Sequence, residues 1–252
     1  MFFWTSELAA APGRRGVRFA FTGRQAHSSA PFDELDLGGR SADPVAKDAV
    51  EANRTAVATA FGLPRERLLF LNQCHGCDVV VADGPWDGDA PTADAVVSAC
   101  DDLALGALTA DCVPVLLADP VAGLVGAVHA GRPGMVSGVV DRAVDALTDV
   151  GATPRDTVAV VGPSVCGRCY EVPEHMRAEA AAVSAPSATV SWTGTPAIDV
   201  AAGVVEQLTA RGLRVTWVAG CTRESPDLFS YRRDRTTRRF AGVVRLLRQT
   251  SS

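Results

Sequence analysis

Short apolar segments that end at Gly, Asp or Pro fill the middle of the chain. Six of them follow one another between residues 68 and 130: LLFLNQ, DVVVAD, ADAVVSA, LALGALTA, VPVLLAD and LVGAVHA. Their length and apolar character predict buried strands. Because no helical pattern separates them, they argue against a doubly wound parallel sheet, in which strands and helices alternate.

Helical patterns surround this block. One begins at Asp43-Pro44 and runs to about Ala60, with Pro at an early helical position and Gly62 at the stop. Three more cover residues 135–147, 173–185 and 199–211, and they accompany the strand-like runs GVRFAFTG, TVAVVG, LRVTWVAG and FAGVVRLL. Strands in a block with helices around them predict an α+β fold. Since no linker or repeat divides the chain, we expect a single domain over residues 1–252.

Composition limits the partners and the location of the protein. The chain has 252 residues, a net charge of -5 and a pI of about 5.4, which give no electrostatic footprint for nucleic acid. The longest apolar runs are far shorter than the roughly 18 residues that span a membrane. The apolar start Met1-Phe2-Phe3-Trp4 has no basic region before it, and Arg14-Arg15 follow too soon for a secretory signal. We expect a cytoplasmic protein that binds neither nucleic acid nor membrane.

Three residues at the ends of strand-like runs could hold a metal. His75 and His129 lie beside glycine, in Cys-His-Gly and His-Ala-Gly, and Cys112 lies where two apolar runs meet. Two imidazoles and one thiolate suit a tetrahedral zinc ion whose fourth position is left to water or substrate, as in catalytic sites. The spacing matches no short metal motif, and a structural role for a buried Cys or a His-Gly pair is the alternative.

The seven cysteines also allow a different zinc site. Two CxxC pairs, Cys74 with Cys77 and Cys166 with Cys169, could combine as four thiolate ligands. Their separation far exceeds that of a zinc ribbon, and neither pair lies in a thioredoxin-like pattern, so both rank below the His-Cys-His set. Cys100 and Cys221 are most simply small core residues.

Six motifs occur in an order that resembles a known family over nearly the whole chain. They are QCHG at 73–76, ADAVVSA at 93–99, TADCVPVLLAD at 109–119, AVHAG at 127–131, GPSVCGRCYEV at 162–172 and FSYRRD at 229–234. The segment LDLGGRSADP, followed by Asn53-Arg54, also looks like the family's opening segment. On these motifs the chain resembles the laccase-domain or polyphenol-oxidase-like proteins, also called the peptidoglycan-editing-factor or purine nucleoside phosphorylase family.

The resemblance implies both a fold and a metal site. The family's fold is a four-layer α-β-β-α sandwich with mixed sheets, which agrees with the strand block and its flanking helices. The family's metal ligands fall on His75, Cys112 and His129. Zinc is the expected metal and copper is the alternative, since imidazole and thiolate ligands bind either ion.

Three activities are attributed to the family that the chain resembles. The first is phosphorolysis of purine nucleosides such as adenosine, inosine and methylthioadenosine, with adenosine deamination beside it. The second is phenol oxidation, and the third is removal of wrongly built peptidoglycan precursors. We expect the first activity. The alternatives are a peptidoglycan precursor hydrolase, a polyphenol-oxidase-type oxidoreductase and a non-catalytic zinc-binding protein. Phenol oxidation requires several coupled coppers, and His27 and His175 are the only spare imidazoles, which disfavours true laccase chemistry.

Phosphorolysis requires positive charge around phosphate. Arg54, Arg232 and Arg233 could form this clamp, and Asn53 and Ser230 are further candidates for substrate or phosphate contacts. For deamination, Asp111 or another carboxylate would handle protons as a catalytic residue beside the metal ligands.

The chain departs from the family pattern at a few positions. Arg132 and Pro133 replace the usual aromatic and basic residues after HAG, Thr237 replaces a glycine, and Asp36 replaces an asparagine in the opening segment. We expect substrate stacking to differ and Asp36 to add negative charge near phosphate. The metal ligands are unaffected.

Overall fold

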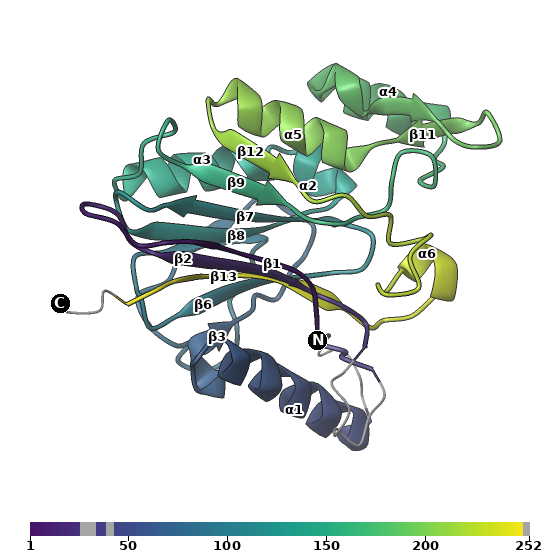
Figure 1. The fold of residues 1–252 in the computed structure, drawn as a ribbon. Helices are drawn as coiled ribbons and strands as arrows, with labels where there is room; N and C mark the ends of the chain where they lie inside the picture. The colour runs from purple at the N-terminus through teal and green to yellow at the C-terminus, as the bar shows by residue number, and fades with distance from the viewer. Residues whose placement is uncertain (26–33, 39–42, 249–252) are drawn as a thin grey trace.

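Two β-sheets pack face to face between two layers of helices (Figure 1). The computed structural model describes residues 1–25, 34–38 and 43–248. Helix α1 covers the outer face of one sheet, and α2, α3, α4 and α5 cover the outer face of the other. The predicted α+β class and the four-layer α-β-β-α order are confirmed.

One sheet has five strands among the described residues. In spatial order they are β1 (Phe2–Leu8), β2 (Val17–Thr22), β13 (Phe240–Leu246), β6 (Ala104–Thr109) and β3 (Leu68–Leu69). β3 pairs with β6 in parallel and the other pairs are antiparallel, so the sheet is mixed, as predicted. The C-terminal strand β13 lies at the centre of the sheet.

The other large sheet has six strands in the described part of the chain. In spatial order they are β12 (Arg214–Trp217), β9 (Val158–Val161), β7 (Val113–Asp119), β8 (Leu124–Ala130), β5 (Ala95–Ser98) and β4 (Val79–Val81). β12 runs parallel to β9 and β4 runs parallel to β5, whereas β7 and β8 are antiparallel to their neighbours. A separate two-stranded ladder joins β10 (Ala188–Val190) and β11 (Pro196–Ile198).

The described helices follow the predicted segments, except that one predicted helix is divided and α6 was not predicted. They are α1 (Pro44–Ala60), α2 (Arg132–Val136), α3 (Val139–Asp149), α4 (Glu174–Val183), α5 (Val200–Ala210) and α6 (Tyr231–Asp234), with 3-10 turns at Arg65–Arg67 and Ala185–Ser187. α1 begins as expected, because the Asp43 carboxylate accepts a hydrogen bond from the Val45 amide at 3.0 Å. The single helix predicted over residues 135–147 is wrong. Gly138 lies between α2 and α3 with a φ of 85°, which interrupts the helix.

The central strands are buried on both faces, and this explains their continuous apolar sequences. In β7, Val115 and Leu117 pack against the helices, while Leu116 and Ala118 pack against the five-stranded sheet. Each of the six segments predicted as strands contains one, although β3 covers only the first two residues of LLFLNQ. They divide between the two sheets, however, with β3 and β6 in one and the remaining four in the other.

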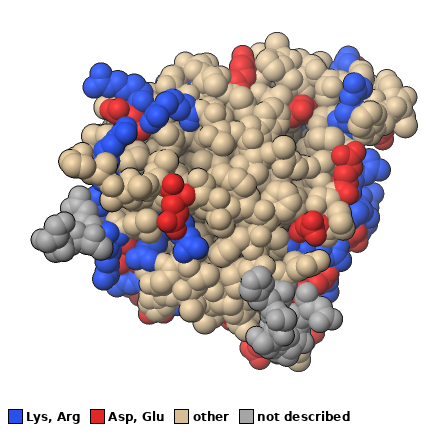
Figure 2. All heavy atoms as spheres, in the orientation of Figure 1, with Lys and Arg blue, Asp and Glu red and all other residues tan. Residues whose placement is uncertain are grey.

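Charged side chains gather toward the edges of the face that Figure 2 shows, and its centre is largely uncharged. Basic and acidic groups lie near one another along these edges. Among the described helices, none has the length and apolar character required to cross a membrane.

A close approach between the sheet and a neighbouring side chain leads to a prediction about stability. A Cβ at Gly106 in β6 would lie 2.3 Å from Cε1 of Phe70. We expect Gly106→Ala to lower the free energy of unfolding by about 1–3 kcal/mol, because the ring must move within a packed core. Urea unfolding measures this change. Gly84→Ala is the matched control, since nothing lies within 4 Å of its Cβ position. Equal stabilities of the two variants would contradict the packing argument.

Candidate metal centre

The predicted metal ligands meet at one end of the six-stranded sheet. His75 lies in the loop between β3 and β4, and Cys112 directly precedes β7. His129 is the second-to-last residue of β8. The register of β7 and β8 pairs Val113 with Ala130, which brings Cys112 beside the end of β8. Residues far apart in the sequence therefore converge because these strands are antiparallel neighbours.

The side chains lie at distances that suit one metal ion. The nearest ligand atoms of His75, Cys112 and His129 all lie within 4.8 Å of one another. Cys112 Sγ is 3.7 Å from His75 Nε2. A tetrahedral zinc ion with normal bond lengths would hold a sulfur and a nitrogen ligand about 3.5 Å apart. His129 is buried, Cys112 is half-buried and His75 is exposed, so one side of the group remains open. The residues present fit a metal ion.

Gly131 allows this close approach. A Cβ at Gly131 would lie 2.7 Å from Cδ2 of His75 and 3.2 Å from Sγ of Cys112. A larger residue would displace both side chains. The Gly of the HAG motif is therefore required by the packing of the neighbouring ligands.

Asp94 connects two of the three ligand positions. Its buried carboxylate lies 2.8 Å from His129 Nδ1, and this contact directs the other ring nitrogen, Nε2, toward the site. The same carboxylate accepts hydrogen bonds from the amides of Cys74 at 3.2 Å, His75 at 3.0 Å and Gly76 at 2.7 Å. These contacts hold the His75 loop, in which His75 has a left-handed φ of 63°.

Asp94 was not predicted as a site residue. ADAVVSA was interpreted as a family motif and a strand, although a carboxylate beside an otherwise apolar run is a signal of a buried charge that needs partners. Asp94 directly precedes β5, and its partners come from two other segments.

The ionisation of the ligands reflects their mutual contact. Burial raises the pKa of the Cys112 thiol, but the facing His129 and His75 imidazoles outweigh it and lower the pKa to about 6. Burial lowers the pKa of His129, but the Cys112 charge and the Asp94 carboxylate raise it to about 9. Hydrogen bonds from His129, Cys74 and Gly76 overcome burial and hold the pKa of Asp94 well below its usual range. Both shifts favour a Cys112 thiolate beside a protonated His129, and a metal cation bound by both side chains would replace that ring proton.

The ligand group opens into a cavity of about 1210 Å³. Its walls combine aromatic rings with an excess of arginine over acidic side chains. The lining arginines are Arg54, Arg65, Arg132, Arg223, Arg232, Arg235 and Arg239, and the lining acids are Glu66, Asp111 and Glu171. The cavity therefore has the charge balance of an anion-binding site.

Asp111 lies next to Cys112, and its contacts are structural. Its Oδ1 accepts hydrogen bonds from Thr222 at 2.6 Å and Ser230 at 2.7 Å, and its Oδ2 accepts one from the Arg232 amide at 2.7 Å. Asp111 also has a left-handed φ of 89°. The carboxylate predicted to handle protons holds the start of α6 through these bonds, and Asp111 also lines the cavity.

Three of the predicted phosphate contacts lie outside the cavity lining. Asn53, Ser230 and Arg233 are not among the described residues that line the cavity. The Asn53 amide donates to the carbonyls of Glu34 and Asp36, and Ser230 is fully buried and caps α6. The Arg233 guanidinium donates to a group of backbone carbonyls, those of Thr222, Arg223, Ser225 and Leu228. In this structure the polar groups of all three side chains bond to the chain itself.

Arg54 and Arg232 do line the cavity. Arg54 donates twice to the Leu37 carbonyl and once to Glu51, and its guanidinium lies 5.0 Å from the centre of the Phe70 ring. Arg232 lies 4.2 Å from the centre of the Tyr170 ring, in stacking contact. Most of the hydrogen-bonding capacity of Arg54 is used by the chain itself.

Two residues that depart from the family pattern, Arg132 and Asp36, have different surroundings. Arg132 begins α2, lines the cavity and donates to Glu179 at 2.8 Å. Asp36 is not among the described residues that line the cavity. Its carboxylate accepts hydrogen bonds from the amides of Gly38 and Arg239, and burial raises its pKa.

His27, one of the spare imidazoles, lies outside the described residues, and His175 lies in the first turn of α4.

Comparison with known proteins identifies the family. A family described as multi-copper polyphenol oxidoreductase laccase matches residues 18–247. The chain belongs to this laccase-like family. A protein named purine nucleoside phosphorylase from Streptomyces griseus is 56% identical over 239 residues, which cover 93% of this chain and 96% of the relative. One of the same name from Mycobacterium tuberculosis is 45% identical over 218 residues, or 86% of each chain.

Solved structures of relatives share the fold. A Neisseria meningitidis protein has a TM-score of 0.82 and 30% identity, covering 98% of this chain and 100% of its own. YlmD from Geobacillus stearothermophilus has a TM-score of 0.82 and 27% identity, covering 94% of each chain. The resemblance inferred from the motifs is confirmed.

The contacts of Asp94 predict that metal affinity depends on its charge. We expect Asp94→Asn to weaken metal binding about 10–100-fold, because His129 loses its carboxylate partner and the amide faces backbone donors. Competition with a chromophoric chelator measures the affinity. Asp78→Asn is the control, since the Asp78 side chain is exposed and its backbone supplies the nearby hydrogen bond. Unchanged affinity of the Asp94 variant would contradict its orienting role.

Proposed function

We propose that this chain is a zinc-dependent purine nucleoside phosphorylase. It would cleave adenosine, inosine or methylthioadenosine with phosphate, and would deaminate adenosine as a side activity. The observation that carries this proposal is the opening of a His-Cys-His ligand group into a large cavity rich in arginine and aromatic side chains. The names of relatives with 56% and 45% identity support the same reaction.

Phosphorolysis places defined demands on such a cavity. A phosphate oxygen forms a bond to C1′ of the ribose, and the bond from C1′ to the purine nitrogen breaks. The electron pair goes to the purine, which takes up a proton as it leaves, and the products are ribose 1-phosphate and the free base. The site must neutralise phosphate, bind a flat base and exclude competing water.

The charged side chains suit the phosphate requirement. In the proposal, Arg232 binds phosphate, because it lines the cavity and its guanidinium lies over the Tyr170 ring. A planar guanidinium forms paired hydrogen bonds with phosphate oxygens. Arg54 adds positive charge to the same cavity while keeping its structural bonds to Leu37.

Aromatic side chains suit the base. Phe70, Trp86, Tyr170 and Tyr231 all line the cavity and provide apolar faces on which a purine can stack. Arg132 occupies a position where the family usually has an aromatic residue, so stacking in this chain would rely on these other rings.

His75, Cys112 and His129 would hold the zinc ion. When bound, zinc supplies a Lewis acid that polarises an oxygen of a reactant. Asp94 orients His129, and Asp111 holds the start of α6 and therefore positions Arg232. Copper is the second candidate metal, because the same ligand set accepts it.

Product analysis tests the reaction. Zinc-loaded protein is incubated with adenosine or inosine, with and without phosphate, and the products are separated by chromatography. We expect free purine and ribose 1-phosphate only with phosphate, and some inosine from adenosine without it. Absence of both reactions in folded, zinc-loaded protein would contradict the proposal and make peptidoglycan precursors the next substrates.

Substitution of Cys112 links the activity to the metal ligands. We expect Cys112→Ala to lower kcat/KM at least about a hundredfold, because loss of a ligand removes several kcal/mol of transition-state stabilisation. Circular dichroism checks that the fold persists. Cys100→Ala is the matched control, as a half-buried thiol outside the described cavity lining. Full activity of the Cys112 variant would exclude catalysis at this site.

Arg232 is expected to act on phosphate and not on the nucleoside. Arg232→Met should raise the KM for phosphate about 10–100-fold, the cost of losing a charge-assisted hydrogen bond, with a smaller effect on the KM for the nucleoside. Steady-state kinetics with each substrate varied in turn separate these effects. Arg155→Met is the control, because the Arg155 side chain is 87% exposed. Equal changes in both KM values would argue against a phosphate contact.

A further inference from the structure

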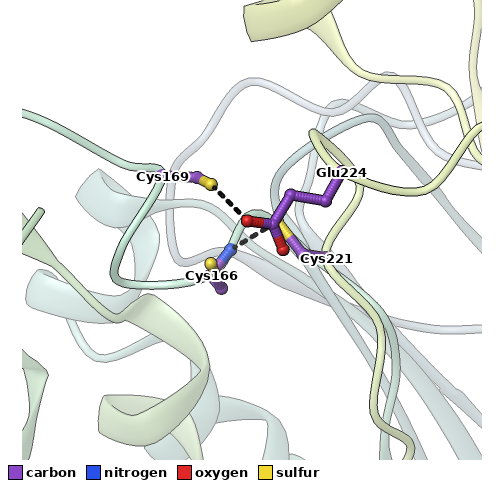
Figure 3. A group of neighbouring side chains, drawn as sticks. All are labelled: Cys166, Cys169, Cys221 and Glu224. Atoms are coloured by element: carbon purple, nitrogen blue, oxygen red, sulfur yellow. Dashed lines mark hydrogen bonds between the residues drawn. The ribbon is translucent and has the colours of Figure 1, made fainter. Parts of the chain in front are cut away.

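A second group of metal-binding side chains lies outside the His-Cys-His site. Cys166 and Cys169 follow β9, and Cys221 and Glu224 follow β12. Because β9 and β12 are parallel neighbours, the two segments leave the sheet at the same end. Figure 3 shows the four side chains, from two separate loops, pointing toward one another. Cys221, which was expected to be a small core residue, is half-buried and belongs to this group.

The donor atoms of this group are close enough for a single ion. One ligand atom from each of the four residues lies within 4.8 Å of the others. Cys169 Sγ is 3.4 Å from Glu224 Oε1. Ordinary zinc–sulfur and zinc–oxygen bond lengths in a tetrahedral site would separate such a pair by about 3.5 Å. The Cys166 amide lies 3.5 Å from Cys221 Sγ, and a backbone donor at this position favours a thiolate.

The backbone holds the two loops in register. The Ser164 amide donates to the Gly220 carbonyl at 3.2 Å, and the Thr222 amide donates to the Ser164 carbonyl at 3.0 Å. Each loop then presents two ligands at the same spacing, as Cys-x-x-Cys and Cys-x-x-Glu. Paired ligands three residues apart on two adjoining loops are the usual arrangement of structural zinc sites.

We propose that Cys166, Cys169, Cys221 and Glu224 form a second metal site, which binds zinc through three thiolates and one carboxylate. A complete set of four protein ligands is typical of a structural zinc ion, and thiolates select zinc over hard cations. The site is separate from the His-Cys-His group and does not depend on the proposed phosphorylase reaction.

The surroundings provide balancing charge and access. Arg223 donates to the Cys169 carbonyl at 3.4 Å, and its positive charge lies beside the ligand loops. A smaller cavity of about 380 Å³ is lined by Cys169, Trp192 and Glu224, and its walls also include Arg168 and Arg223. Glu224 is exposed, so an ion can reach the ligands from the surface.

The proposed ion would fasten part of the large cavity wall. Tyr170 directly follows Cys169, and Arg223 lies between Cys221 and Glu224. Both Tyr170 and Arg223 line the large cavity. A zinc ion joining the two loops would fix these side chains relative to each other without contacting substrate.

Metal analysis of purified variants tests the second site. Cys112→Ala disables the first site, and we expect this protein to retain one zinc ion per chain. Cys112→Ala combined with Cys169→Ser should retain none. Cys112→Ala combined with Cys100→Ser is the matched control and should still hold one ion. X-ray absorption on the single variant should show sulfur-rich coordination of the retained zinc.

Opposite results would overturn the proposal. These are a Cys112→Ala protein that holds no zinc and gains none on titration, zinc without sulfur ligands, or a disulfide among Cys166, Cys169 and Cys221 in protein purified under reducing conditions. If Cys169→Ser fails to fold, Glu224→Gln in the Cys112→Ala background provides the second test, because Glu224 is exposed. We expect that substitution to weaken zinc binding about tenfold or more, and unchanged affinity would remove Glu224 from the ligand set.

Discussion

The buried carboxylate of Asp94 is the interaction on which the candidate metal centre depends. A carboxylate removed from water is costly unless hydrogen-bond donors surround it. Asp94 meets this requirement with three consecutive backbone amides and the His129 ring. The loop must fold tightly around the carboxylate to supply those amides, and His75 accordingly has a left-handed backbone. Satisfying one charge therefore sets the positions of two ligands that lie far apart in the sequence.

The two-sheet core gives these polar groups a rigid support. β7 and β8 are buried along their whole length, and their neighbours β5 and β9 fix them on both sides. The ends of these strands and of β12 carry Cys112, His129, Asp94 and the Cys166 and Cys221 loops. Strand directions place all of these segments at the same end of the sheet. The other residues of these strands contribute to the packed core.

Local patterns predicted most of the elements and selected the three side chains that meet in the His-Cys-His group, but they could not predict other long-range contacts. Continuous apolar runs identified the strands because burial on both faces leaves that signature. The same runs did not reveal that β3 and β6 belong to a different sheet from their neighbours, since pairing depends on partners elsewhere in the chain. Asn53 and Arg233 were predicted as phosphate contacts because amides and guanidinium groups bind phosphate, and in the structure both donate to backbone carbonyls. Cys221 lies near Cys166 because β9 pairs with β12. Sequence spacing alone does not predict which strands pair.

The central place of β13 has a consequence for the order of assembly. β13 pairs with β2 on one side and β6 on the other, yet it follows all the other strands along the chain. During synthesis, β2 and β6 leave the ribosome long before the strand that separates them. Until β13 is made, their inner edges have unpaired amides and carbonyls, and α1 lacks part of the surface on which it packs. The five-stranded sheet therefore closes last, and a nascent chain passes through a stage in which two exposed strand edges must be kept from pairing with other chains.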